Sequence, residues 1–251
     1  MARKKLIAAN WKMNKTIGEA KAFIETLKSG LADLPDCDLV VFPPFMAVPR
    51  SCGLLDGTGV AVGAQDLFWE ASGAFTGEIS AGMIESAGAT YVLVGHSERR
   101  HVIGEDNDIV ARKLSAALRS SLTPILCVGE KIEHREAGKH ETYIRAQLET
   151  AFSGLSENDA ARVVVAYEPV WAIGTGKTAT PGDAVAMHEF IRGWARENLR
   201  GDLAGRLRIQ YGGSVKPDNA ATLLGEDEID GALIGGASLE ADSFLAIAAA
   251  A

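Results

Sequence analysis

Short apolar runs recur along the chain, each followed by glycine, proline or polar residues and then by a longer amphipathic segment. We expect eight strands, at residues 6–9, 39–42, 60–64, 91–94, 124–128, 163–167, 207–211 and 231–234. Hydrophobicity within these runs is nearly continuous rather than alternating, which is typical of strands buried on both faces. The pattern therefore predicts a parallel sheet covered by helices.

The segments between the runs predict helices. Residues 16–27 have the spacing of one apolar helix face, with Ile17, Ala20, Phe23, Ile24 and Leu27. Residues 106–118 repeat this spacing, although Lys113 falls within the apolar stripe. Proline and aspartate suit the first turn of a helix over 181–194. We expect a further helix to start within 214–217 and a last one, capped by Ser238, to end near residue 247.

Eight strand–helix units in 251 residues fit one α/β domain over 1–251, a single (β/α)8 barrel. A doubly wound open sheet is the competing architecture. Its usual G-x-G-x-x-G turn after the first strand is missing, because residues 10–14 read NWKMN. The pattern therefore favours the barrel.

Composition narrows the function classes. The formal net charge of −8 argues against a general nucleic-acid or membrane-surface binder, yet it permits a local site for a small anion. The three cysteines, Cys37, Cys52 and Cys127, lack the paired spacing of disulfide or zinc frameworks. The apolar run after the basic start is short for a signal peptide, and no stretch approaches the roughly 18 residues of a membrane span. We expect a cytoplasmic protein without metal, nucleic-acid or membrane contacts.

Polar residues follow several predicted strands, at the barrel end where active sites lie. Asn10 and Lys12 follow the first strand, His96 the fourth and Glu168 the sixth. Lys12 could equally be a surface lysine, His96 a hydrogen-bonded core residue and Glu168 a solvated loop residue. Their common end favours proton abstraction next to a carbonyl, by a base, a neutral donor and a cation. The apolar residues after Glu168 should make it a stronger base by excluding water.

Glycine pairs at 212–213 and 235–236 follow the last two strands. Their backbone N–H groups could face a phosphate at a helix N-terminus, although two tight turns would also favour glycine. The sequence GTGKT at 174–178 is not a P-loop, because that motif requires glycine where the chain has Trp171. We interpret 169–177 as a glycine-hinged lid.

Several blocks at these positions resemble one enzyme family. They are NWKMN at 10–14, GAFTGEIS at 73–80, GHSERR at 95–100, AYEPVWAIGTG at 166–176, YGGSV at 211–215 and GGASL at 235–239. All resemble the triosephosphate isomerases, in the family's order and without a departure at a functional position. The resemblance implies a TIM barrel that interconverts D-glyceraldehyde 3-phosphate and dihydroxyacetone phosphate through a cis-enediolate, in glycolysis and gluconeogenesis. No cofactor or metal is implied.

The resemblance also implies residue roles. Glu168 would carry the proton between adjacent carbons, and neutral His96 would donate to the developing negative charge. The full implied catalytic set is Glu168, His96, Lys12, Asn10, Ser97 and Glu98, with Ser97 orienting the base and Glu98 holding the lysine. The phosphate of this three-carbon substrate would contact Asn10, Lys12, Gly174, Ser214, Gly235 and Gly236. The implied lid is Pro169, Val170, Trp171, Ala172, Ile173, Gly174, Thr175, Gly176 and Lys177.

In this family the loop 65–79 docks into a partner subunit. The resemblance therefore implies a homodimer with Gln65, Phe75 and Thr76 at the interface. The aromatic side chains Phe68, Trp69 and Phe75 would be unfavourable in water. The alternative is a loop folded onto its own barrel.

Two other functions stay open at this point. Another phosphosugar isomerase or an aldolase would share the barrel and the phosphate site. A Schiff-base aldolase, however, needs a lysine on a central strand, and none of the eight runs contains one. A non-catalytic barrel would be expected to have lost the base or the lid, and both blocks are present.

Overall fold

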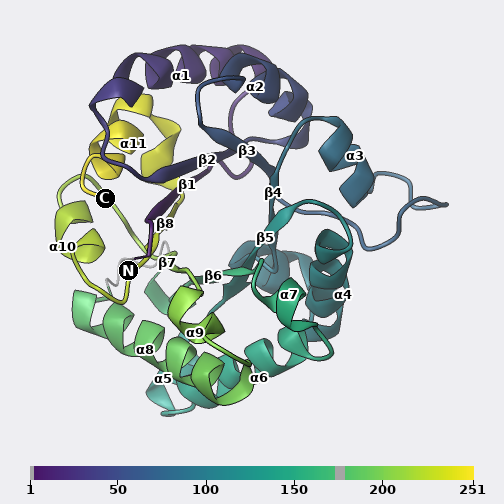
Figure 1. Cartoon of the computed structure of the whole chain (residues 1–251), viewed down its shortest axis with the longest axis vertical. Helices are drawn as coiled ribbons and strands as arrows, with labels where there is room; N and C mark the ends of the chain where they lie inside the picture. Colours follow the sequence, from purple (N-terminus) through teal and green to yellow (C-terminus); the bar gives the residue numbers. More distant parts are fainter. Residues whose placement is uncertain (1–2, 173–178) are drawn as a thin grey trace.

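The computed structural model describes residues 3–172 and 179–251, and its eight parallel strands close into a barrel inside a ring of helices (Figure 1). The strands pair in chain order, and β1 also pairs with β8. They are β1 (Leu6–Asn10), β2 (Asp38–Phe42), β3 (Ala61–Ala64), β4 (Tyr91–Val94), β5 (Thr123–Val128), β6 (Val164–Tyr167), β7 (Ile209–Tyr211) and β8 (Gly231–Ile234). The predicted (β/α)8 TIM barrel is confirmed.

Helices of very different length cover the barrel. The longer ones are α1 (Ile17–Gly30), α2 (Val48–Leu55), α4 (Asn107–Leu118), α6 (His140–Phe152), α8 (Pro181–Asn198) and α11 (Ala241–Ala248). The shorter ones are α3 (Ala81–Ser86), α5 (Ile132–Glu136), α7 (Glu157–Ala160), α9 (Leu203–Arg206) and α10 (Ala220–Leu224). Thr16 and Thr180 begin α1 and α8 with capping boxes, and Asp106 caps α4, so local sequence sets these helix starts.

The expected helix start within 214–217 is wrong. The chain turns there, and helix α10 begins only at Ala220. The cause is Asn219, whose Oδ1 accepts from the amide of Lys216 at 2.8 Å and whose Nδ2 donates to the carbonyl of Ser214 at 3.0 Å. These local bonds offer the backbone an alternative to helical hydrogen bonding.

The expected cap of the last helix is also wrong. The hydroxyl of Ser238 donates back to the carbonyls of Ile234 at 2.8 Å and Gly235 at 2.7 Å. Ser238 thus lies within a short 3-10 helix, Gly236–Leu239, and α11 begins only at Ala241. The residue at the N-cap of α11 is instead Glu240, and its side chain makes no capping hydrogen bond.

Strand residues alternate between two apolar layers. One layer fills the barrel interior, with side chains such as Leu6, Phe42 and Leu233, and the other lies between strands and helices. Burial on both faces explains the continuous hydrophobicity of the runs. Register aligns Val128 with Tyr167, and Tyr167 with Tyr211, so the residues that follow these three meet at one end of the barrel. In the described part of the chain, no helix is long and apolar enough to span a membrane.

Candidate active site

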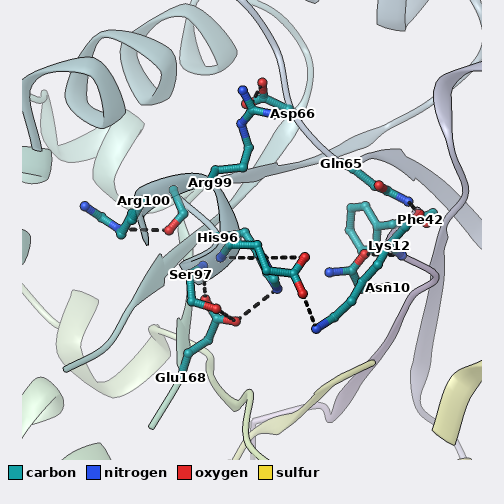
Figure 2. A network of polar contacts seen from close by, with 12 residues as sticks. Asn10, Lys12, Phe42, Gln65, Asp66, His96, Ser97, Arg99, Arg100 and Glu168 are labelled. Carbon is teal, nitrogen blue, oxygen red and sulfur yellow. Dashed lines mark hydrogen bonds and ion pairs between the residues drawn. The ribbon is translucent and has the colours of Figure 1, made fainter. Parts of the chain in front are cut away.

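The C-terminal ends of the strands surround a cavity of about 320 Å³. Its lining includes most of the predicted catalytic and phosphate-binding residues, namely Asn10, Lys12, His96, Glu168, Ser214, Gly235 and Gly236. The predicted residue Ser97 lies beside His96 (Figure 2), and the amide of the predicted residue Glu98 donates to the ring of His96. Side chains from strand ends far apart in sequence therefore converge on one space.

The carboxylate of Glu168 is buried, 2% exposed, and three donors hold it (Figure 2). The amide of Ser97 donates to Oε2 at 2.8 Å and its hydroxyl to Oε1 at 3.0 Å, while Nε2 of His96 lies 3.1 Å from Oε1. Burial raises the pKa of Glu168, but His96 and Ser97 stabilise the charged form and bring this pKa below its ordinary value. The prediction that Glu168 is a stronger base is therefore wrong for this conformation.

Two neighbours define the hydrogen bonding of His96. The amide of Glu98 donates to Nδ1 at 3.2 Å, which places the proton of a neutral ring on Nε2, toward Glu168. Burial lowers the pKa of His96, and the nearby Glu168 carboxylate raises it above its ordinary value. A second ring proton on Nδ1 would break the bond from Glu98. The geometry thus favours a neutral ring that donates from Nε2.

Lys12 has an unusual backbone conformation that two side chains support. Its φ is +52°, in the left-handed region that residues other than glycine rarely adopt. Oδ1 of Asn10 accepts from its amide at 3.0 Å, and Nε2 of Gln65 donates to its carbonyl at 2.8 Å. Its Nζ donates to Oε1 of Glu98 at 2.6 Å. The amine of Lys12 is therefore directed into the cavity region, where it is already paired with the carboxylate of Glu98.

The predicted glycine pairs lie where the site packs against main chain. A Cβ at Gly212 would lie 2.8 Å from Cγ of Glu168, and one at Gly235 would lie 3.1 Å from Cε of Lys12. At Gly236 a Cβ would meet open space. Side chains at the first two positions would displace the groups expected to react or bind, and phosphate binding at 235–236 stays a prediction.

The predicted lid is described only in part. Its residues Ile173, Gly174, Thr175, Gly176 and Lys177 lie outside the described residues. Before them, Val170–Ala172 forms a 3-10 helix after Pro169.

A buried carboxylate that the sequence did not indicate lies beneath this segment. Oε1 of Glu130 accepts from Nε1 of Trp171 at 2.9 Å and from the hydroxyl of Tyr167 at 3.0 Å. Burial raises the pKa of Glu130. Residues on both sides of Glu168 along the chain are thus attached to one side chain of the loop after β5.

A buried ion cluster adjoins the site. Nζ of Lys113 lies 2.7 Å from Oδ1 of Asp66 and 2.6 Å from Oε1 of Glu105, and Nε of Arg99 lies 3.0 Å from Oδ2 of Asp66. Burial raises the pKa of Asp66 to about 6. Asp66 follows Gln65 and Arg99 follows Glu98, so the cluster joins the loops after β3 and β4. The one indication of this cluster in the sequence is Lys113, which falls within the apolar stripe of α4.

Among the described residues, no group of three or more histidine, cysteine or acidic side chains is arranged to hold a metal ion. The groups that line the cavity include the buried carboxylate of Glu168, the imidazole of His96, the paired amine of Lys12 and glycine backbone. This set can move protons and bind a small anion.

The triosephosphate isomerase family model matches residues 5–251. A triosephosphate isomerase from Roseiflexus sp. (strain RS-1) is 53% identical over 245 residues, which cover 98% of this chain and 96% of the relative. One from Chloroflexus aurantiacus is 51% identical over 242 residues, covering 96% and 97%. One from Moorella thermoacetica is 49% identical over 245 residues, covering 98% of each. The similarity extends over nearly the whole length of each protein.

Proposed function

Because the chain belongs to the triosephosphate isomerase family, we propose that it interconverts D-glyceraldehyde 3-phosphate and dihydroxyacetone phosphate through a cis-enediolate, with Glu168 as base and His96 as neutral electrophile. The observation that carries this proposal is the convergence of Glu168, His96 and Lys12 on one cavity bordered by glycine backbone. These are a base, a donor and a cation beside room for a phosphate.

Glu168 would take the proton from one carbon and return it to the next. In the described conformation, its bonds from Ser97 stabilise the charged carboxylate and weaken it as a base. Substrate binding would therefore have to move the carboxylate away from Ser97. Once the contacts with His96 and Ser97 are both lost, burial remains and raises the pKa of Glu168.

His96 would donate from Nε2 to the substrate oxygen on which negative charge develops. The bond from the Glu98 amide to Nδ1 fixes this tautomer before the substrate arrives. A preorganised donor stabilises the transition state because no reorientation is needed during the reaction. Lys12 and Asn10 would add positive charge and a further donor near the same oxygens.

The phosphate would bind where the residues after β7 and β8 line the cavity. Lys12, Ser214, Gly235 and Gly236 line this space, and main-chain amides at glycine positions can approach an anion closely. Gly174 and the rest of the lid would complete the site from outside the described residues. Closure would keep water from the enediolate.

The proposed enzyme is a homodimer. Seven large apolar side chains of the described residues are exposed, and all lie in the first four strand–helix units: Met13, Ile17, Met46, Phe75, Met83, Val102 and Ile103. These units are neighbours in the barrel, and the loop between β3 and α3 extends away from it (Figure 1). The rings of Phe68 and Phe75 lie 4.6 Å apart, yet Phe75 stays 43% exposed. A second copy of this face would cover such a surface.

A coupled assay with the purified chain and no added metal tests the activity. In deuterated water, product formed through an enediolate should carry deuterium at the carbon that receives the proton. Glu168→Gln should lower kcat by about 10²–10⁴-fold while inorganic phosphate still inhibits. Near-native turnover of this variant would contradict the role of Glu168.

Dilution tests the assembly. Activity and the dimer fraction from sedimentation should fall together, and Phe75→Glu should move both transitions to higher protein concentration. A fully active monomer would refute the proposed interface.

A further inference from the structure

One buried side chain outside the barrel holds the loop that lies against Glu168. Gln147 is on α6, in the outer ring of helices (Figure 1), and is 2% exposed. Its Oε1 accepts from the amide of Gly129 at 2.9 Å, and its Nε2 donates to the carbonyl of Gly129 at 3.2 Å. One primary amide therefore satisfies both main-chain polar groups of Gly129.

Gly129 in turn touches the main chain of Glu168. A Cβ at Gly129 would collide with the carbonyl oxygen of Glu168, so the two backbones are in direct contact. The amide of Glu168 also donates to the carbonyl of Val128 at 2.8 Å. Residues 128–129 thus set the position of the main chain from which the side chain of Glu168 extends.

The next residue extends this contact. Glu130 accepts from Tyr167 at 3.0 Å and from Trp171 at 2.9 Å. Tyr167 precedes Glu168 directly, and Trp171 lies three residues after it. The loop 128–130 is therefore a support for the base, and Gln147 is its attachment to the helix layer.

We propose that Gln147 is a positioning residue for Glu168. The inference rests on the proposed role of Glu168 as the base. Proton transfer depends steeply on distance, and a misplacement of about 1 Å from a remote change can lower a rate by about 10²-fold. Gln147 acts on the reaction by fixing Gly129, and it touches neither substrate nor reacting atoms. Its loss should lower kcat and leave phosphate binding intact, because Lys12 and the glycine pairs lie on other strands.

Gln147→Glu gives a signature that a merely structural role would not. The protonated glutamic acid can accept from the Gly129 amide and donate to its carbonyl, as glutamine does. The ionised form places negative charge against that carbonyl. The kcat of the variant relative to the native protein should therefore fall about 10-fold or more as pH rises and recover as pH falls. KM and the inhibition constant for inorganic phosphate should stay within about two-fold of native values.

Two further variants complete the test. Gln147→Leu removes both bonds and should lower kcat about 10-fold at every pH, without the pH-dependent ratio. Leu148→Ala, a buried truncation on the same helix, should destabilise the fold but keep native kcat. If Gln147→Leu does not fold, the pH dependence of Gln147→Glu decides alone.

Native kcat for Gln147→Leu, or for Gln147→Glu at pH values at which its introduced carboxyl is shown to be ionised, would overturn the inference. A loss in Leu148→Ala equal to that in Gln147→Leu would do the same. The native chain and Glu168→Gln are measured first. An inactive native chain or an active Glu168→Gln would overturn the proposed function itself, so the two failures are distinct.

Discussion

His188 tests how strongly the core beneath the site excludes charge. Its ring lies on α8, fully buried, with Nδ1 3.0 Å from the carbonyl of Glu228 and an edge-on contact to Tyr167 at 6.0 Å between centroids. Its Nε2 is buried without a hydrogen-bond partner among the described residues. Burial lowers the pKa of His188 from 6.5 to about 4.

The sign of the effect on stability follows from proton counting. Between pH 6.5 and about 4, the unfolded chain binds this proton and the folded chain does not, so stability falls as pH falls. With these two pKa values, the free energy of unfolding should decrease by about 2 kcal/mol between about pH 7.5 and 5. The full loss, below the folded pKa, is about 3 kcal/mol. This is a large part of the usual 5–15 kcal/mol or so of a folded domain.

The assay is urea unfolding of the native protein and His188→Asn, each at about pH 7.5 and 5. Asparagine can keep the donation to Glu228 but does not titrate, and all other ionisable groups are common to both proteins. Protein concentration is held fixed because subunit association would contribute to stability. The variant should be weaker at the higher pH through lost packing, yet lose about 2 kcal/mol less per chain on acidification. Equal losses in both proteins would refute the reasoning.

Three other changes test the site. Lys12→Met should weaken inhibition by inorganic phosphate and lower kcat together; unchanged affinity would remove Lys12 from the site. Gly129→Ala should lower kcat about 10-fold or more, because its Cβ collides with the carbonyl of Glu168, and native kinetics would show that the loop relaxes freely. Lys216 lines the cavity and is exposed, so Lys216→Gln should lower kcat/KM several-fold at low ionic strength and hardly at all in about 1 M salt. The exposed Arg200→Gln, after α8, is the charge-matched control, and an equal effect there would exclude a local role for Lys216.

The barrel could be predicted from the sequence because a strand that is buried on both faces is a continuous run of apolar residues. All eight strands lie within two residues of the predicted ranges. Helix starts were less secure where a side chain bonds to nearby backbone. Asn219 and Ser238 both do so, and both displaced a predicted start.

The site could be predicted where the position of a residue along the chain determines its position in the fold. Residues that follow parallel strands must meet at one end of the barrel, so Lys12, His96 and Glu168 could be grouped without coordinates. Glu130 and Gln147 could not, because each acts through a contact with a distant segment and belongs to no local motif. The prediction that burial makes Glu168 a stronger base was wrong for a similar reason, because His96 and Ser97 lower its pKa by more than burial raises it.

An acidic chain can serve an anionic substrate because its site charges are already matched before binding. Lys12 is paired with Glu98, and Glu168 is held by Ser97 and His96. A bound phosphate would compete with Glu98 for the amine, and a substrate beside His96 would compete with Glu168 for the Nε2 proton. Binding would then exchange the partner of the amine, and the half-exposed carboxylate of Glu98 would be solvated by water instead. In that exchange Glu168, the proposed base, would lose the donors that lower its pKa, so the energy of binding the substrate would make the base stronger only when there is a proton to remove.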